Sequence, residues 1–448
     1  MANAQHVEIF RQGVAAWNRW RSENPRLTPD LREVESPGAA LEEADLSRAL
    51  LIDANLKDAK LSRARLDKAI LGAADLSGAD LTNAGLTGAE LHGALLEGAN
   101  LSGATLDHAI CLDAVLHGAN LMGASLLRAT FKNAHLRGAD LRGSSHSNTD
   151  FSGADLTDAK LSDTFAAGGS FAAATLRGAR MGSAVLSGAD LARADLRKAR
   201  LKGADLTGAN LEEANLSGAD LTEADLSKTQ LARADLTKAR IVDCAVFGIS
   251  AWGADFKGAE QSSLRITDLG ESLVVVDDLE LAQFTYLLLQ NRSLRDIITT
   301  IEANIVLLLG HFPEGRDWIL DEMRGKLRRR GYTPILYDSE PRRGREVIET
   351  MWTLARMARF VVADFTDAMS VAHELRAVVP ELPNVPVQPM MAAGQDEGKV
   401  IDQLTRDRSV LTLYRYRDAE TLIGALDERI FAPAEAKSYK MMAREPLS

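Results

Sequence analysis

The chain has 448 residues, a net charge of −11, and 46% hydrophobic but only 5% aromatic residues, so its length predicts two to four domains of roughly 100–200 residues. No stretch approaches the ~18 consecutive apolar residues of a membrane span, and Met1 to Phe10 lack the apolar core of a signal peptide. Two cysteines cannot staple a chain of this length, and no region is strongly basic, so we expect a cytoplasmic protein whose partners include neither a membrane nor a nucleic acid.

The first element that the pattern predicts is one amphipathic helix over residues 6–23. Its apolar residues include Phe10, Trp17 and Trp20, and Pro25 follows its end. Residues 1–38 precede a long repeat, and the open end of a repeat array exposes unpaired strand edges. We therefore expect this helix to cap the repeats.

A five-residue repeat occupies residues 39–260. Of the 44 positions in steps of five from Leu41 to Phe256, 33 are Leu, and the position two residues earlier is Ala in 37 of 44. Five residues turn a helix by roughly 140°, and on a strand successive leucines would face opposite sides, so neither regular structure accepts this period. A chain that turns after each unit does accept it. Leu and Ala then fill a narrow interior, which explains the shortage of aromatic residues.

The unit resembles the A-(D/N)-L-x-x repeat of the pentapeptide-repeat family, for example in Ala44-Asp45-Leu46-Ser47 and Ala204-Asp205-Leu206-Thr207. The resemblance implies a β solenoid, specifically a right-handed quadrilateral β-helix with four units per coil. The 44 units then predict about eleven coils of 20 residues. At a strand spacing of ~4.8 Å, the rod would be roughly 50 Å long.

Reading the sequence in steps of 20 residues stacks particular side chains. Phe131, Phe151 and Phe171 share one inward column, and His146 occupies another. The Ala position is lost on either side of His146, which predicts a distortion of the solenoid there. A buried histidine suggests a ligand, but a hydrogen-bonded core histidine is the simpler expectation, and no metal site is predicted.

Some outward positions that are usually Asp or Asn are apolar instead. Ile70 and Ile110 share one column, and Leu95 and Val115 share another. This apolar strip predicts a surface for a protein partner or for self-association, and the alternative is ordinary surface scatter. Some pentapeptide-repeat proteins protect DNA gyrase by imitating duplex DNA. Residues 41–260 hold 29 acidic and 23 basic residues, a mixture that imitates DNA poorly.

Beyond residue 260, short apolar runs alternate with helical patterns. Residues 261–302 predict a connector with a strand at 274–276 and helices at 279–290 and 293–302. Strict alternation over 303–431 predicts an α/β domain with a doubly wound parallel sheet, and 432–448 is expected to be a flexible tail. The expected strands are 305–309, 333–337, 360–363, 385–391 and 410–414, and the expected helices are 314–330, 345–357, 370–379, 397–405 and 419–430.

Ligands of doubly wound sheets bind beyond the carboxyl ends of the strands, at the switch point of the strand order. These ends carry Gly310-His311-Phe312 and Asp364-Phe365-Thr366-Asp367, and the next helix carries Glu374 one turn beyond Ser370. A carboxylate at a helix start, beside a loop able to hold a nucleotide, suits stabilisation of positive charge on a ribose. The GxGxxG and Walker motifs are absent, which argues against a dinucleotide redox enzyme and a P-loop ATPase. Such carboxylates are also ordinary helix caps.

About 130 residues of this region resemble the flavodoxin-like Toll/interleukin receptor (TIR) fold and its nucleoside deoxyribosyltransferase-like relatives. Asp338, Pro341 and Gly344 match the loop after the second strand, and Glu374-Leu375 matches the Glu-Leu of the helix with the catalytic glutamate. The usual Trp and Cys before that glutamate are replaced by Val371-Ala372-His373. Active relatives cleave the N-glycosidic bond of NAD or a nucleoside, so the resemblance implies that Glu374 is catalytic. The nucleotide-binding candidates are Gly310, His311, Phe312, Asp338, Asp364, Thr366, Asp367 and Ser370.

Together these patterns predict a rigid scaffold that presents a TIR-like effector or signalling domain. The resemblance implies an assembly-activated NAD glycohydrolase in a bacterial defence or signalling system, with NAD as a substrate and no bound cofactor. One alternative is a non-enzymatic scaffold for protein interaction whose α/β domain binds a nucleotide or a protein. A third is the DNA mimic that protects gyrase.

Overall fold

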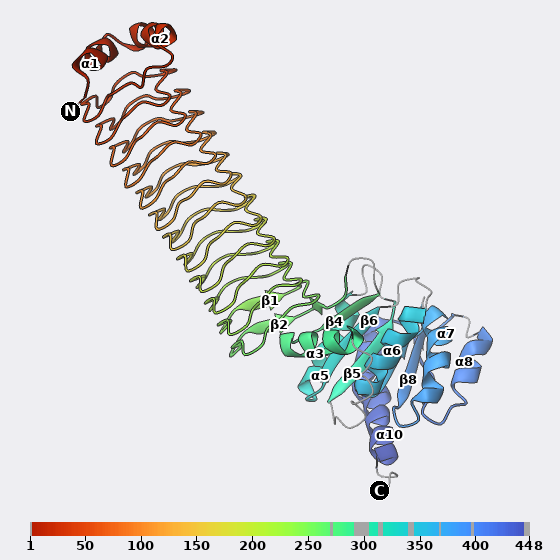
Figure 1. Cartoon of the computed structure of the whole chain (residues 1–448). Helices are drawn as coiled ribbons and strands as arrows, with labels where there is room; N and C mark the ends of the chain where they lie inside the picture. Colours follow the sequence, from red (N-terminus) through yellow and green to blue (C-terminus); the bar gives the residue numbers. More distant parts are fainter. Residues whose placement is uncertain are drawn as a thin grey trace. The chain divides into compact units, whose positions relative to one another are not determined.

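The computed structural model describes residues 2–268, 272–290, 304–311, 317–338, 345–366, 369–395 and 398–442. The chain divides into two compact units (Figure 1). The first comprises Met1–Ala245 and Ile249–Glu260, and the second comprises Val246–Gly248 and Gln261–Ser448.

The N-terminal cap consists of two helices instead of the single helix that the sequence predicts. Helix α1 covers Ala4–Arg11 and helix α2 covers Val14–Glu23. The chain breaks between them at Gly13, whose φ of 94° lies in a region that suits glycine. The side chain of Asn3 caps α1 by accepting hydrogen bonds from the backbone N–H groups of Gln5 and His6.

Helix α2 binds the backbone of the first coils through its inward face. The indole Nε1 of Trp17 donates to the Asp45 carbonyl at 2.9 Å, and Asn18 exchanges hydrogen bonds with Glu43 O and Asp45 N at 3.0 and 2.8 Å. Arg21 donates to Ser47 O at 2.9 Å. These contacts satisfy backbone groups at the open end of the repeats, as expected of a cap.

We expect Trp17→Phe to destabilise the capped end by about 1–2 kcal/mol, because it removes a buried hydrogen bond and leaves the Asp45 carbonyl without its donor. Trp17 is 1% exposed, whereas Trp20 is half-buried on the same helix. Trp20→Phe is therefore the matched control. Urea unfolding followed by circular dichroism measures both, and equal losses of stability would contradict the role of the indole donor.

The repeats form a solenoid. In each unit, the residue just before the Leu position forms a parallel β-bridge with the residue 20 positions later. The pairing starts at Asp30↔Leu50 and continues to Asp235↔Asp255. The solenoid therefore begins about nine residues before the boundary at residue 39 that the sequence suggests. Its last turns contain strands β1 (Arg240–Val242) and β2 (Glu260–Ser262), which form a two-stranded sheet.

Each unit ends in a tight turn that explains its polar positions. The Ala44 N–H donates to Leu41 O at 3.1 Å, and Glu43, between them, has a φ of 60°. Equivalent positions in other units have the same left-handed backbone, which is why many of them are Gly. The Asp or Asn before each Leu accepts from the backbone two residues on, as Asp45 does from Ser47 N at 3.1 Å.

The interior is built as predicted from Leu and Ala, nearly all of them with no exposed surface. Phe131, Phe151 and Phe171 stack with ring centroids 5.2 Å apart at each step. The predicted distortion beside His146 is wrong, because the ladder runs through it: Ser145 bridges Phe165, and His146 N donates to Phe165 O at 2.8 Å. The backbone repeat therefore persists where the Ala pattern fails.

The second unit contains a seven-stranded sheet in the order β3-β4-β6-β5-β7-β8-β9. Its five parallel strands are β5 (Ile305–Gly310), β6 (Thr333–Asp338), β7 (Ala358–Asp364), β8 (Val387–Ala392) and β9 (Tyr414–Tyr416). Strands β3 (Leu264–Arg265) and β4 (Leu273–Val276) extend the sheet antiparallel beyond β6. The predicted connector over 261–302 thus contributes two strands to the sheet. The strand order changes direction at β5, beside β7.

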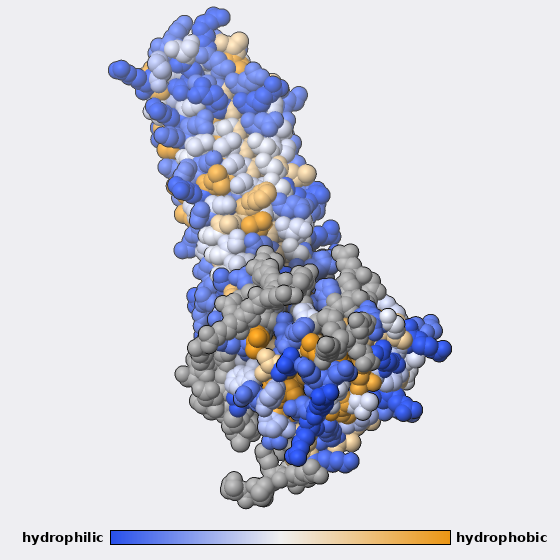
Figure 2. Space-filling view, turned by 90° about the vertical axis from the view of Figure 1, so that its right-hand side faces the viewer, coloured by the Kyte–Doolittle hydropathy of each residue, from blue (hydrophilic) through white to orange (hydrophobic). Residues whose placement is uncertain are grey.

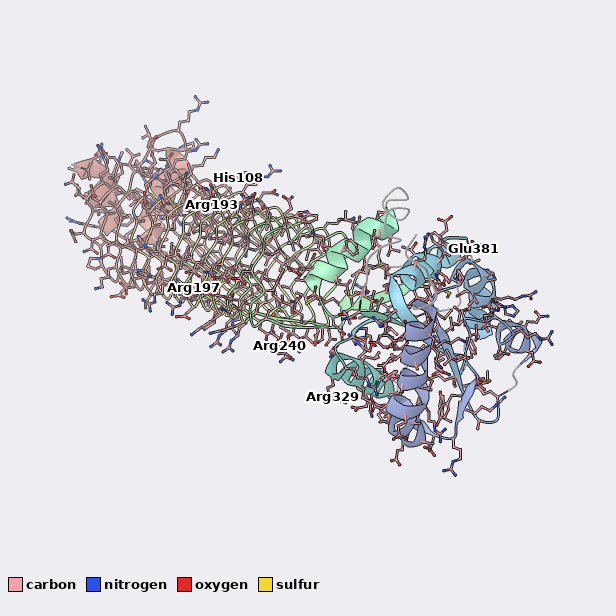
Figure 3. All side chains as sticks on the ribbon, turned by 90° about the horizontal axis from the view of Figure 1, so that it is seen from below. His108, Arg193, Arg197, Arg240, Arg329 and Glu381 are labelled. Atoms are coloured by element: carbon pink, nitrogen blue, oxygen red, sulfur yellow. The ribbon has the colours of Figure 1, made fainter. Side chains whose placement is uncertain are left out.

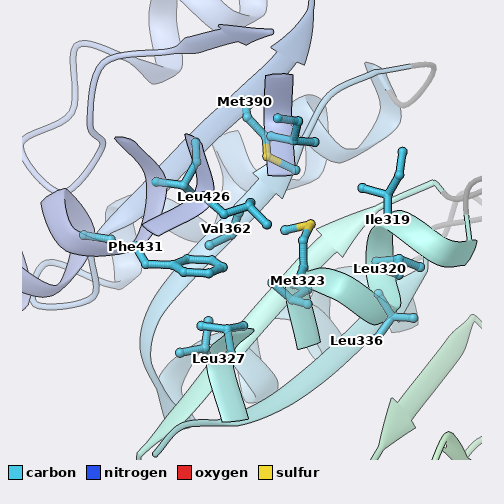
Figure 4. Packing of buried hydrophobic residues seen from close by; sticks show 14 of the residues in the cluster. Ile319, Leu320, Met323, Leu327, Leu336, Val362, Met390, Leu426 and Phe431 are labelled. Carbon is cyan, nitrogen blue, oxygen red and sulfur yellow. The ribbon is translucent and has the colours of Figure 1, made fainter. Parts of the chain in front are cut away.

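Helices cover both faces of this sheet. On one face, α5 (Asp317–Arg329), α9 (Ala419–Ala425), the π-helix η2 (Leu426–Phe431) and α10 (Ala432–Met442) pack on apolar side chains such as Leu336, Val362 and Met390 (Figure 4). The other helices are α3 (Leu279–Gln290), α6 (Arg345–Met357), α7 (Met369–Val378) and α8 (Gly398–Leu404), with the short 3-10 helix η1 (Val379–Glu381) after α7. Figure 1 shows α6 and α7 opposite α10 across the sheet.

Two expectations near the C-terminus need correction. Residues 432–442 form α10 and bury Ala434 against the sheet, so this part of the predicted tail is ordered. The last strand lies at Tyr414–Tyr416 instead of 410–414, and Val410 makes a single bridge to Val387. The predicted helix at 293–302 lies outside the described residues.

Candidate functional site

The candidate site lies where β5, β6 and β7 end and α7 begins. Gly310 pairs with Asp338 across β5 and β6, so His311 follows directly beside the end of β6. The His311 Nδ1 lies 3.2 Å from an Asp338 carboxylate oxygen, and both side chains retain some exposure. The structure thus brings together three of the predicted nucleotide-binding residues, Gly310, His311 and Asp338.

Glu374 lies on α7, about one turn beyond Ser370, and is half-buried. Its Oε2 is buried and has no hydrogen-bond partner among the residues that the structure describes. Burial raises the pKa of Glu374 to about 7. Catalytic sites use carboxyl groups of this kind, with a pKa that burial raises close to 7 and no hydrogen bond to hold them in a structural role.

Tyr337, at the end of β6, lies close enough to Glu374 for their charges to interact. Burial raises the pKa of Tyr337 to about 12, a hydrogen bond with Ser272 opposes this, and the negative charge of Glu374 raises the pKa further. Nothing in the sequence pattern singles out Tyr337, because it continues the apolar run of Ile335 and Leu336 that is typical of a buried strand. The charge interaction of Tyr337 with Glu374 indicates that the last residues of β6 lie near Glu374 on α7.

Asp364 and Thr366 belong to a hydrogen-bond network at the ends of β7, β8 and β9. Tyr416 Oη donates to Asp364 at 3.1 Å and lies 2.7 Å from the Thr366 hydroxyl. Thr366 N donates to Asp364 at 2.9 Å, and Ala392 N donates to the Thr366 hydroxyl at 2.9 Å. Both side chains are buried, and these contacts give them a structural role in joining three strands. Tyr416 is a second residue that the sequence did not select.

Other predicted site residues are only partly placed. Phe312 and Asp367 lie outside the described residues, as do Pro341 and Gly344 of the loop after β6. Ser370 is half-buried on α7. In the described part of the chain, no group of three His, Cys, Asp or Glu side chains is arranged to hold a metal ion. The described helices include none with the length and apolar character of a membrane span.

The apolar strip of the solenoid is discontinuous. Glu90 separates Ile70 from Ile110 in their column, whereas Leu95 and Val115 are direct neighbours in theirs. Leu95 is 41% exposed, and the other three strip residues are half-buried. Figure 2 shows hydrophobic residues in small separate groups on one face of the solenoid.

The charges of the solenoid surface are mixed and often paired. Arg197 contacts Asp195 at 2.6 Å, and Arg240 contacts Glu260 at 3.3 Å. Figure 3 shows Arg193, Arg197 and Arg240 among the side chains of the solenoid surface. Cationic groups therefore interrupt its acidic columns.

Comparison with known proteins finds similarity in the solenoid. The family described as pentapeptide repeats matches residues 38–67, 59–98, 99–138, 134–166, 170–208 and 204–241. HetL, a pentapeptide repeat protein involved in heterocyst differentiation regulation from the cyanobacterium Nostoc sp. strain PCC 7120, is 32% identical, and the match covers 47% of this chain and 90% of HetL with a TM-score of 0.24.

Two further solved structures are similar to part of this chain. A pentapeptide repeat protein from the thylakoid lumen of Arabidopsis thaliana is 25% identical over 29% of this chain and 77% of its own, with a TM-score of 0.20. QnrB1, a plasmid-mediated fluoroquinolone resistance protein, is 19% identical over 51% of this chain and 92% of its own, with a TM-score of 0.18. The comparison with curated proteins gives no match.

Proposed function

Because this chain belongs to the pentapeptide repeat family, we propose that its solenoid is a scaffold for the second unit, and that this α/β unit hydrolyses the N-glycosidic bond of NAD. The observation that carries the proposal is Glu374, whose buried Oε2 has no hydrogen-bond partner among the described residues. The parallel strand order β6-β5-β7-β8-β9, with its switch point beside β5 and β7, supports a nucleotide site at the same edge. The resemblance to TIR domains and to deoxyribosyltransferase-like proteins supplies the reaction class.

In the proposed reaction, the bond between C1′ of the ribose and the nicotinamide nitrogen breaks, and nicotinamide leaves with the electron pair. Water then adds to C1′ and loses a proton, which gives ADP-ribose. The Glu374 carboxylate accepts hydrogen bonds from the ribose hydroxyls and stabilises the positive charge that develops on the sugar. Its buried position strengthens this interaction, because fewer water molecules screen it. His311 and Asp338 would provide polar contacts for the nucleotide.

The direct test is release of nicotinamide. Purified protein at high concentration is incubated with NAD, and nicotinamide is quantified by chromatography beside Glu374→Ala. We expect release from the wild type and only background release from the variant. Equal inactivity of the two proteins, with the wild type folded, would count against hydrolysis and favour the non-enzymatic scaffold.

The second candidate function is protein interaction through the apolar strip. It is favoured by Leu95 and Val115, which are adjacent on neighbouring coils and apolar where most units have Asp or Asn. An interaction of this kind would also provide the assembly that activates the α/β unit. The DNA-mimic alternative receives no support from the surface, because paired arginines interrupt the acidic columns. A gyrase supercoiling assay is expected to show no effect of the protein.

We expect Ile110→Asp combined with Val115→Asp to reduce self-association, because each introduces a charge into a contact that depends on apolar area. Light scattering during gel filtration measures the mass of both proteins. Thr130→Asp, on the same column one coil beyond Ile110, is a matched control outside the strip. An oligomer of unchanged mass in the double variant would exclude this surface as the interface.

A further inference from the structure

A cavity of about 570 Å³ lies between helix α2 and the first coils of the solenoid. This volume falls within the roughly 300–1,000 Å³ of small-molecule sites. Both walls belong to the same compact unit, and hydrogen bonds from Trp17, Asn18 and Arg21 fix α2 to the coils. The lining residues are Asn18, Arg21, Ser22, Pro25, Glu43, Asp45, Ser47, Arg48 and Arg65.

Three arginines from separate parts of the fold converge on this cavity. Arg21 comes from the last turn of α2, Arg48 from a corner of the solenoid, and Arg65 from the coil position that bridges Asp45. Burial lowers the pKa of Arg21, the positive charges of Arg65 and Arg48 lower it further, and Asp45 opposes them. Arg65 and Arg48 therefore both lie close enough to Arg21 for their positive charges to act on it.

Two polar atoms in the cavity wall lack hydrogen-bond partners among the described residues. Arg21 is 6% exposed, and its two terminal nitrogens donate to Leu27 O and Ser47 O, but its Nε donates to no acceptor. The Ser47 hydroxyl is also buried without a partner. A buried donor without an acceptor costs free energy, which a bound oxygen ligand would recover.

The carboxylates of the cavity neutralise the arginines incompletely. Asp45 lies 3.8 Å from both Arg21 and Arg65, beyond hydrogen-bond distance, and Glu43 pairs with Arg63 at 3.4 Å outside the lining. Arg48 has no ion pair with any residue that the structure describes. Three arginines thus line the cavity with only two carboxylates, and one of these carboxylates, Glu43, also pairs with Arg63.

We propose that this cavity binds a phosphate group. A phosphate presents several oxygens in a tetrahedral arrangement, so it can accept from more than one guanidinium group at once, and three arginines line this cavity. Its two negative charges would offset their repulsion, and its oxygens would accept from Arg21 Nε and the Ser47 hydroxyl. The cavity is larger than one phosphate ion, so a phosphate ester also fits.

The test is isothermal titration calorimetry of the full chain at low salt, with inorganic phosphate and with adenosine monophosphate as two probes. We expect saturable binding that weakens with added chloride. Arg48→Gln and Arg65→Gln should each weaken it about tenfold, because each removes one charge-assisted hydrogen bond. Both side chains are exposed, so these variants keep the fold. Arg19→Gln, which removes an exposed charge of α2 outside the cavity, should leave the affinity within about twofold.

Tighter binding of the nucleotide than of the free ion would identify a phosphate ester as the ligand, and equal affinity would identify the ion itself. Either result supports the site. Absence of saturable binding by both probes would overturn it, as would equal weakening by Arg19→Gln and Arg48→Gln. The test does not involve Glu374, so its outcome is independent of the proposed hydrolysis.

Discussion

Glu374→Gln should lower nicotinamide release from NAD about 10²–10³-fold, the usual loss when one preorganised electrostatic group is removed from a transition state. Glutamine keeps the shape of the side chain but removes the negative charge that, in the proposed reaction, stabilises the ribose cation. The effect should appear mainly in kcat, because the charge on the sugar develops only during bond cleavage. Initial rates at saturating NAD measure it.

The pH profile gives a second measure of the same group. Burial raises the pKa of Glu374 to about 7, so activity that requires its carboxylate should rise as the pH passes through about 7. Glu381→Gln changes an exposed glutamate just beyond α7 and should preserve both rate and profile (Figure 3). A wild-type profile that is flat across this range would argue that Glu374 takes no part in the reaction.

Glu374→Gln should also be more stable than the wild type at pH 8. The folded-state pKa of Glu374 is raised above its ordinary 4.5, so the wild type loses stability as the pH rises from about 4.5 through about 7. Allowing for the exposed half of the side chain, we expect Glu374→Gln to gain about 1 kcal/mol, or about 2–4 °C in Tm. If Glu374 acts as proposed, its burial lowers the stability of the fold while favouring its reactivity.

His146 should make the solenoid sensitive to acid. Its imidazole is fully buried among Phe151 and Phe171, and neither ring nitrogen has a hydrogen-bond partner in the described part of the chain. Burial lowers its pKa to about 4 from an ordinary 6.5. Unfolding therefore takes up a proton between these values, so stability falls as the pH drops through this window, by about 3 kcal/mol in all.

His146→Leu should remove this loss, because leucine fills the same interior column in most other coils and carries no titratable group. Urea unfolding followed by circular dichroism, at neutral pH and near pH 4.5, gives the difference between variant and wild type. His108→Leu, at an exposed corner, is the control and should retain the acid sensitivity. If His146→Leu loses as much stability in acid as the wild type, the sensitivity arises elsewhere.

The repeat was predictable because its period is incompatible with any regular element, and the pairing of residues 20 apart confirms the coil length. The first coil was missed because Pro29-Asp30-Leu31 and Val34-Glu35-Ser36 lack the Ala-Leu signature while adopting the same backbone pairing. Backbone hydrogen bonds define a coil, and they tolerate side chains that the pattern excludes. The expectation of a distortion at His146 failed for the same reason.

The expectation that His146 would be hydrogen-bonded was also wrong. Neighbouring carbonyl groups are already used: Ser144 donates to Leu141 O at 2.6 Å and Thr149 to Leu126 O at 2.5 Å. These residues replace Ala in the interior and satisfy their own hydroxyl groups locally. The sequence shows which residues break the pattern, but not which acceptor each of them takes.

The sequence predicted which strand ends form the candidate site, but not the contacts that its side chains make there. Sequence periodicity places Glu374 on the helix where the structure has it, whereas Gly310 and Asp338, expected just beyond their strands, are the last residues of β5 and β6. The roles of Asp364 and Tyr337 depend on partners distant in sequence, such as Tyr416, which lies 52 residues from Asp364. Polar contacts of this kind follow from the packing of the sheet, which local patterns do not encode.

The pairing of residues 20 apart also limits how the solenoid can change in length. Inserting or deleting five residues preserves the interior Leu and Ala, but it rotates every later residue by one side of the coil. The arginines of the cavity, the residues of the apolar strip and the charged columns would then lie beside different residues. Gain or loss of a whole coil keeps all columns aligned, so evolution and protein engineering can adjust the length freely only in steps of 20 residues, whereas a single-unit change reassigns the surface.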